Sequence, residues 1–232
     1  AFDEAKRYKP SDKVGGPRDQ LLNHLDAEAL QPVVAGRVPL AIFANRESDI
    51  RQAVQLGQDY GIRVIIYGGT EAWRVADLLA AHRVGVVLDP VTNLPSTFDD
   101  LGVRADNAAL LQKAGVTIAF FVPGIQQSHN VGTGIREGAG IAVAHGLPWN
   151  EALKAITVNP ARLWGIDDHY GRIARGQDAD LVLWDGDPLE PTSAPLAVYV
   201  RGVAMSLDTR QKALRDKYAP QHRQDPWPPA YR

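Results

Sequence analysis

Arg63-Val64-Ile65-Ile66-Tyr67-Gly68-Gly69-Thr70 is the most informative stretch of the chain about its fold. The run from Arg63 to Tyr67 is rich in β-branched residues, which is typical of a strand. The two glycines with Thr70 predict a turn. Apolar residues then recur at helical spacing, which predicts a helix carrying Trp73, Ala76, Leu79 and Ala80. The stretch therefore opens a strand–turn–helix unit of the kind that builds a parallel sheet.

The same unit recurs on both sides of this stretch. Short apolar runs predict further strands at 39–44, 84–88 and 116–121. Helices are predicted at about 19–30, 50–61, 107–114 and 134–146, and a long polar loop lies between residues 89 and 106. Four β–α units are half of an eight-fold barrel or a small open doubly wound sheet, and the spacing alone does not separate the two. The parallel order is itself inferred from the crossover lengths.

The pattern changes after residue 147. Two short helices are predicted at 148–156 and 159–165, the second with Asn159 as its cap. Strands at 179–184 and 196–201 follow, the first of them expected to be buried, and then a charged helix at 210–218. A region with short strands therefore follows the β–α units.

Composition excludes some classes of function. The 232 residues carry 25 basic and 27 acidic side chains, so nothing favours nucleic acid or an anionic membrane as a partner. No apolar run approaches the roughly 18 residues needed to span a bilayer. The absence of cysteine excludes disulfides and thiolate metal sites.

Two segments carry a resemblance to a known family. They are Ala152-Leu153-Lys154-Ala155-Ile156-Thr157-Val158-Asn159-Pro160-Ala161-Arg162-Leu163-Trp164-Gly165 and Gly171-Arg172-Ile173-Ala174-Arg175-Gly176-Gln177-Asp178-Ala179-Asp180-Leu181-Val182-Leu183-Trp184-Asp185-Gly186-Asp187-Pro188. In content and order they resemble the C-terminal part of members of the amidohydrolase superfamily, and within it those of the imidazolonepropionase-like and prolidase-like branch. The similarity runs from about residue 38 to about residue 218.

The resemblance implies an α/β fold, namely the C-terminal half of a TIM-like (β/α)8 barrel followed by part of a small β-sandwich. It divides the chain into a partial barrel at 1–165, part of the composite sandwich at 166–210, and a C-terminal helix and tail at 211–232. The chain opens at Ala1 among helix formers and without Met. We therefore expect the other half of the barrel to lie upstream of it.

Relatives of this kind hydrolyse amide-type C–N bonds with one or two divalent metals such as zinc, held at the C-terminal ends of barrel strands. The resemblance places Phe43 and Gly68 where relatives carry a His on the fifth and sixth strands, and Pro123 where they carry an Asp on the eighth. None of these side chains offers a donor to a metal. We therefore expect no catalytic residue, metal site or cofactor in this chain as it stands.

Several polar or aromatic residues should still face the mouth of such a barrel and could contact a ligand: Asn45, Arg46, Tyr67, Thr70 and His129. Each has a plainer interpretation. Arg46 could clamp an anion or simply pair at a helix start, Tyr67 and Thr70 could serve packing or a turn, and His129 could make a loop contact. Asp89 and Asn93 are further candidates, whereas the other five histidines are expected to be surface or capping residues.

The sequence thus favours an amidohydrolase-related protein without its own metal site, a degenerate barrel that binds a small molecule or a partner. The alternative is an active metal-dependent amidohydrolase or peptidase whose ligands lie mainly in an upstream segment. An isolated half-barrel would leave sheet edges and an unfilled core uncovered. We therefore expect a partner, either the missing N-terminal half or another amidohydrolase-like subunit in a homo- or hetero-oligomer.

Overall fold

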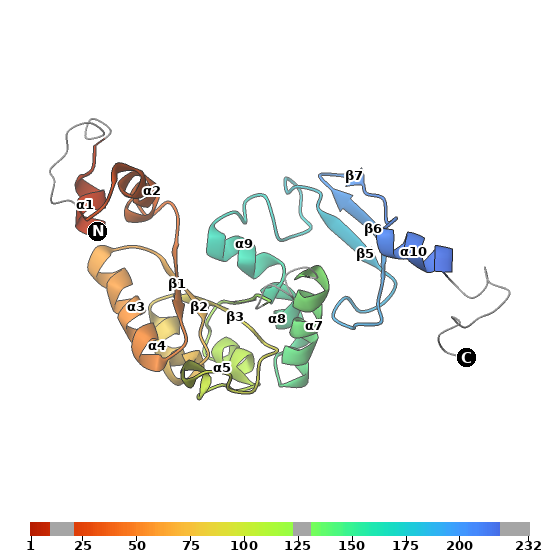
Figure 1. The fold of residues 1–232 in the computed structure, drawn as a ribbon, viewed down its shortest axis with the longest axis horizontal. Coiled ribbons are helices and arrows are strands. Elements are labelled where there is room, and N and C mark those ends of the chain that lie inside the picture. The colour runs from red at the N-terminus through yellow and green to blue at the C-terminus, as the bar shows by residue number, and fades with distance from the viewer. Residues whose placement is uncertain (10–20, 123–130, 219–232) are drawn as a thin grey trace. The chain divides into compact units, whose positions relative to one another are not determined.

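The computed structural model describes residues 1–9, 21–122 and 131–218, and the chain separates into two compact units (Figure 1). Unit 1 comprises Ala1–Gln177 and Asp187–Ser193, and unit 2 comprises Asp178–Gly186 and the chain from Ala194 onward. None of the helices in these described ranges is long and apolar enough to cross a membrane.

Unit 1 is built on a four-stranded parallel sheet of order β1-β2-β3-β4. Its strands are β1 (Leu40–Ala44), β2 (Val64–Gly68), β3 (Gly85–Leu88) and β4 (Ile118–Phe120). All four predicted strands are present, and the parallel order is confirmed. Strands that are consecutive in the chain are neighbours in the sheet. Each connection therefore leaves one strand, passes through its helices on one face of the sheet, and enters the adjacent strand.

Helices connect the strands, and further helices precede the first strand and follow the last one in the chain. They are α1 (Phe2–Arg7), α2 (His24–Val34), α3 (Glu47–Tyr60), η2 (Ala72–Val75), α4 (Ala76–Ala81), η3 (Phe98–Asp100), α5 (Asn107–Lys113), α7 (Val131–Ala144), α8 (Trp149–Ala155) and α9 (Val158–Trp164). Helix α3 ends at Gly61 in the left-handed conformation, as predicted. Helix α2 starts later than predicted because the Asn23 side chain accepts a hydrogen bond from the Asp26 N–H and caps it there.

The pairing register sorts the strand residues onto two faces. Alternate residues such as Ile66, Val86 and Ile118 point into the main core beneath the helices. The opposite face carries a smaller cluster formed by Ile65, Val87 and Ala119, with Leu163 of α9 packed against it. Gly85 leaves the space that the Leu163 side chain occupies, so α9 closes this face near the N-terminal ends of the strands.

Asn159 does not cap its helix, and this prediction is wrong. Helix α9 begins one residue earlier, at Val158, after Thr157. The Asn159 side chain is only 7% exposed, and its Nδ2 donates a 2.9 Å hydrogen bond to the carbonyl of Ile118 in strand β4. Its role is therefore to fasten the helix to the sheet, because a buried carbonyl without a donor is costly.

Unit 2 contains a three-stranded antiparallel sheet and one helix. The strands β5 (Leu181–Trp184), β6 (Pro195–Val200) and β7 (Val203–Ala204) lie in that order, and α10 (Arg210–Tyr218) follows. The prediction that the first of these strands is buried is wrong, since Val182 and Leu183 are 45% and 58% exposed. The described part of the unit holds one sheet, and a second sheet that would bury these side chains is not among the described residues.

We predict that Asn159→Ala lowers the free energy of unfolding by about 1–3 kcal/mol, because the buried carbonyl of Ile118 loses its donor. Urea denaturation followed by circular dichroism measures this. Asn150→Ala is the matched control, since Asn150 is exposed near the start of α8 and its Nδ2 donates a 3.5 Å hydrogen bond to the side chain of the neighbouring Glu151. Equal losses for the two variants would contradict the role given to Asn159.

Candidate functional site

The candidate site lies where the parallel strands end. A cavity of about 590 Å³ opens there, and we call it the mouth cavity. Its wall comes from the ends of β1, β2 and β4, the loop after β3 and the start of α5. Ligands of parallel α/β proteins bind at the C-terminal ends of the strands, so this cavity is the first place to look for function.

Three aromatic rings form a layer across the floor of the mouth cavity. Phe43 and Tyr67 are paired in the β1–β2 register, and their ring centroids are 6.3 Å apart. Phe121, just after β4, lies 4.3 Å from Tyr67. Phe43 remains 69% exposed, and burial raises the pKa of the Tyr67 hydroxyl above its usual value. The strand ends therefore present an apolar aromatic surface to the cavity.

Gly68 and Asn45 form a second part of the wall. Gly68 has a φ of +99°, and a Cβ at this position would collide with the side-chain oxygen of Asn45. The Asn45 Nδ2 donates a 3.3 Å hydrogen bond to Asp100, whereas its Oδ1 has no hydrogen-bond partner among the described residues. Glycine is thus required at position 68 by backbone conformation and by space. A histidine would fit there only if Asn45 moved.

Asp100 organises the loop that borders the cavity. It closes a capping box with Thr97 at the start of η3, a short helical turn within the segment that was predicted to be a long polar loop. Its carboxylate accepts hydrogen bonds from the hydroxyls of Ser96 (2.9 Å) and Thr97 (2.8 Å). Burial acts to raise the pKa of Asp100, but these hydrogen bonds outweigh it and hold the pKa below its usual value.

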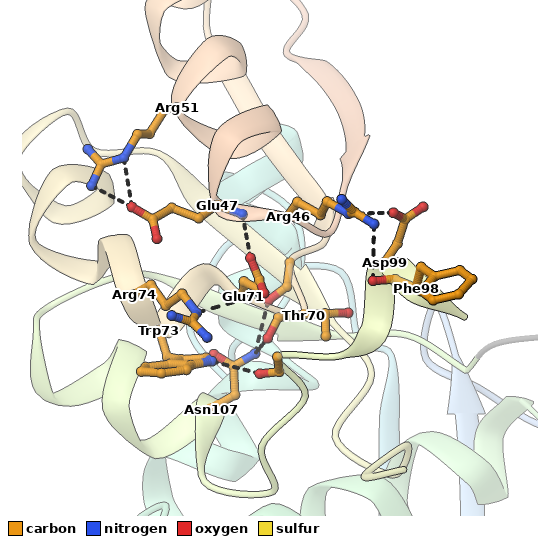
Figure 2. Close-up of polar contacts among 12 residues, drawn as sticks. Arg46, Glu47, Arg51, Thr70, Glu71, Trp73, Arg74, Phe98, Asp99 and Asn107 are labelled. Carbon is orange, nitrogen blue, oxygen red and sulfur yellow. Dashed lines mark hydrogen bonds and ion pairs between the residues drawn. The ribbon is translucent and has the colours of Figure 1, made fainter. Parts of the chain in front are cut away.

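Arg46 lies beside the mouth cavity and is already paired. Its guanidinium Nε is 2.6 Å from the carboxylate of Asp99, and its NH2 group donates to the carbonyl of Phe98 at 3.2 Å (Figure 2). Arg46 is not among the residues that line the cavity. In this structure it fastens the η3 turn to the start of α3.

Two residues that the sequence analysis missed hold the strand-end loops together (Figure 2). The Glu71 carboxylate accepts a 2.9 Å hydrogen bond from the backbone N–H of Glu47 at the start of α3. Asn107 is 6% exposed, and its Nδ2 donates to the carbonyl of Gly69 at 3.0 Å. The sequence around Asn107 indicates the start of a helix. It carries no signal for the contact with Gly69, which lies 38 residues away in the chain.

The structure brings most of the predicted site residues together. Phe43, Asn45, Tyr67, Gly68, Thr70 and Asp89 all line the mouth cavity. Asn93 is not among the lining residues, and Pro123 and His129 lie outside the described residues. The described histidines His24, His82, His145 and His169 do not line it either, and His82 contacts Gln58.

Comparison with known proteins identifies the family. The model of the amidohydrolase family matches residues 43–207, which include the strand ends and both segments that suggested the resemblance. The chain belongs to the amidohydrolase family. Amidohydrolase tasK of Hapsidospora irregularis is 43% identical over 60 residues, which are 26% of this chain and 6% of that protein.

Solved structures of amidohydrolases share the fold. An amidohydrolase from Thermotoga maritima superposes with a TM-score of 0.74 at 29% identity, covering 88% of this chain and 53% of that chain. A Xaa-Pro dipeptidase with bound methionine in its active site superposes with a TM-score of 0.59 at 22% identity, covering 83% of this chain and 50% of that one. The chain thus spans about half the length of these amidohydrolase structures.

Amidohydrolases generally use a divalent metal, but the described residues of this chain do not fit one. Phe43 and Gly68 carry no donor atoms on their side chains. In residues 1–9, 21–122 and 131–218, no group of three or more His, Asp or Glu side chains is placed to hold a metal ion. With Pro123 and His129 outside these ranges, the expected lack of a metal site stays a prediction.

We predict that Asp100→Asn costs more stability at pH 6 than at pH 3. The folded-state pKa of Asp100 lies below the unfolded value of about 3.9. Its ionised form therefore stabilises the fold above that value, and the contribution is lost as the pH falls through the folded pKa. Urea unfolding of both proteins at the two pH values measures the difference.

Asp77→Asn provides the control, because it removes a carboxylate from the exposed side of α4. We expect it to lower the free energy of unfolding at pH 6 less than Asp100→Asn does, since Asp100 closes a capping box and Asp77 does not. An Asp100→Asn effect that is the same at pH 6 and pH 3 would contradict the hydrogen bonding assigned to this carboxylate.

Proposed function

We propose that this chain is a non-hydrolytic member of the amidohydrolase family that binds a small molecule at the mouth of a (β/α)8 barrel. The aromatic layer of Phe43, Tyr67 and Phe121 carries this proposal. A metal-activated water needs polar ligands around it, and here the strand ends present apolar rings. A cavity of about 590 Å³ above these rings is large enough for a small molecule.

We propose further that the sheet of unit 1 is the C-terminal half of that barrel. Within the described sheet, β1 and β4 each pair on one side only. The face that carries Ile65, Val87 and Ala119 is apolar, as the interior of a closed barrel would be. Coverage of 53% of the Thermotoga maritima amidohydrolase at a TM-score of 0.74 is consistent with half of a larger fold.

The second candidate function is metal-dependent hydrolysis, with the metal held by residues outside the described ones. Membership of the amidohydrolase family favours it, because the family generally uses a divalent metal. Under this alternative, the aromatic layer would line the substrate site beside the metal. The two candidates differ in metal content, which can be measured without knowing a substrate.

We predict far less than one zinc ion per chain by elemental analysis, both after purification without chelator and after incubation with Zn²⁺ and desalting. The reason is the lack of donor side chains at the strand ends. Phe43→His is the matched variant. We expect it to stay below one zinc per chain, since one histidine alone does not make a site and Gly68 has no room for a second. Stoichiometric zinc in the wild-type chain would favour hydrolysis instead.

We predict that the isolated 232-residue chain associates through the open edges and the interior face of its sheet. Sedimentation velocity should show a species larger than a monomer. Ala41→Lys, which places a charge on the exposed end of β1 facing the interior, should weaken this association. Ala81→Lys at the exposed end of α4 should not. A monodisperse wild-type monomer that unfolds cooperatively would overturn this proposal.

A further inference from the structure

The aromatic layer of the mouth cavity is suited to a positively charged group. Aromatic rings carry a partial negative charge on their faces, so a cation within about 6 Å of a ring centroid is attracted to them. Phe43, Tyr67 and Phe121 are adjacent in space, with centroids 6.3 Å and 4.3 Å apart along the series. The ring of Phe43 is 69% exposed within the described chain, and all three aromatic residues line the cavity.

The charged groups in the wall favour the same ligand. Asp89, Asp99 and Asp100 line the cavity, and among the described lining residues Arg104 is the one that carries a positive charge. Arg104 is already paired with Asp106: its guanidinium donates two hydrogen bonds of 2.7 Å to the two carboxylate oxygens. Asp99 is paired with Arg46. Asp89 and Asp100 therefore remain as carboxylates without a cationic partner among the described residues, and they accept hydrogen bonds only from neutral groups.

Two amide oxygens add to this excess of acceptors. Asn45 and Asn107 both line the cavity and both use their Nδ2 groups in hydrogen bonds within the protein. Their Oδ1 atoms have no hydrogen-bond partner among the described residues. Asn107 is only 6% exposed, and a buried polar atom without a partner is unusual. Both oxygens are closed to solvent, so they add partial negative charge to the wall of the cavity and make no direct contact with a ligand.

We propose that the mouth cavity binds an organic cation with an apolar body, such as an amine or quaternary ammonium compound that carries an aromatic or aliphatic group. This inference rests on the proposed function, because it takes the mouth cavity as the ligand site. The apolar body packs on the rings, and the cationic group lies between the ring faces and the carboxylates of Asp89 and Asp100. Anions are disfavoured because both arginines beside the cavity are already paired with aspartates.

Three probes of similar size and different charge test this proposal by isothermal titration calorimetry on the full chain. They are benzyltrimethylammonium, benzyl alcohol and phenylacetate. We expect benzyltrimethylammonium to bind about tenfold or more tightly than either of the others, a ratio that cation–π and carboxylate contacts of ordinary strength would produce. Its affinity should fall as NaCl is raised, because the carboxylates at the cavity rim are screened by salt.

Variants place the binding at the mouth cavity. Phe43→Leu and Asp89→Asn should each weaken benzyltrimethylammonium binding by roughly 3-fold to 10-fold. Phe98→Leu is the matched control, because Phe98 is exposed in the neighbouring η3 turn and is not among the residues that line the cavity. This variant should bind benzyltrimethylammonium with the affinity of the wild-type chain. Because Phe43 is itself exposed, we expect Phe43→Leu to fold. A thermal melt of each variant checks its folding.

Tighter binding of phenylacetate, equal binding of all three probes, or no binding of benzyltrimethylammonium would overturn the proposal. An equal loss of affinity in Phe98→Leu and Phe43→Leu would overturn it as well. Zinc content measured on the same sample separates this result from the proposed function. Weak cation binding in a zinc-free chain contradicts only the ligand class, whereas stoichiometric zinc contradicts the non-hydrolytic function itself.

Discussion

The geometry of the strand ends in unit 1 starts from the parallel register between β1 and β2. This register sets Phe43 beside Tyr67 and Ala44 beside Gly68. Because side chains alternate between the two faces of a strand, the two rings share the face opposite the main core, and Ala44 belongs to that core. A shift of one residue would bury the rings and expose the core residues. The chemistry available at the strand ends therefore follows directly from this pairing.

Polar side chains then fix the loops that this register brings together. Glu71 connects the loop after β2 to the start of α3, Asn107 connects α5 to the turn at Gly69, and Arg46 connects α3 to the η3 turn. Each contact joins segments that are distant in the chain. The wall of the mouth cavity is thus held by hydrogen bonds between loops, as well as by the strands beneath it.

Most of the fold could be predicted from local patterns. The four parallel strands, the helix ended by Gly61 and the charged helix at 210–218 all follow from β-branched runs, helical spacing and a terminating glycine. Asn159 shows where such reasoning fails. Its place before Pro160 is typical of a cap, yet its side chain bonds to Ile118, 41 residues away. The capping box of Thr97 and Asp100 was a local signal that the polar composition of its loop concealed.

Patterns along the chain establish the order of strands and helices, the family likeness, and the absence of a metal-binding side chain at positions 43 and 68. The folded structure was needed to show that Phe43, Tyr67 and Phe121 form one layer, that Asn45 fills the space beside Gly68, and that Arg46 is paired with Asp99. The two groups of features differ in the range of the interactions that produce them. Backbone preferences act over a few neighbouring residues, whereas the wall of a cavity is set by strand pairing and by hydrogen bonds between segments that meet only when the chain folds.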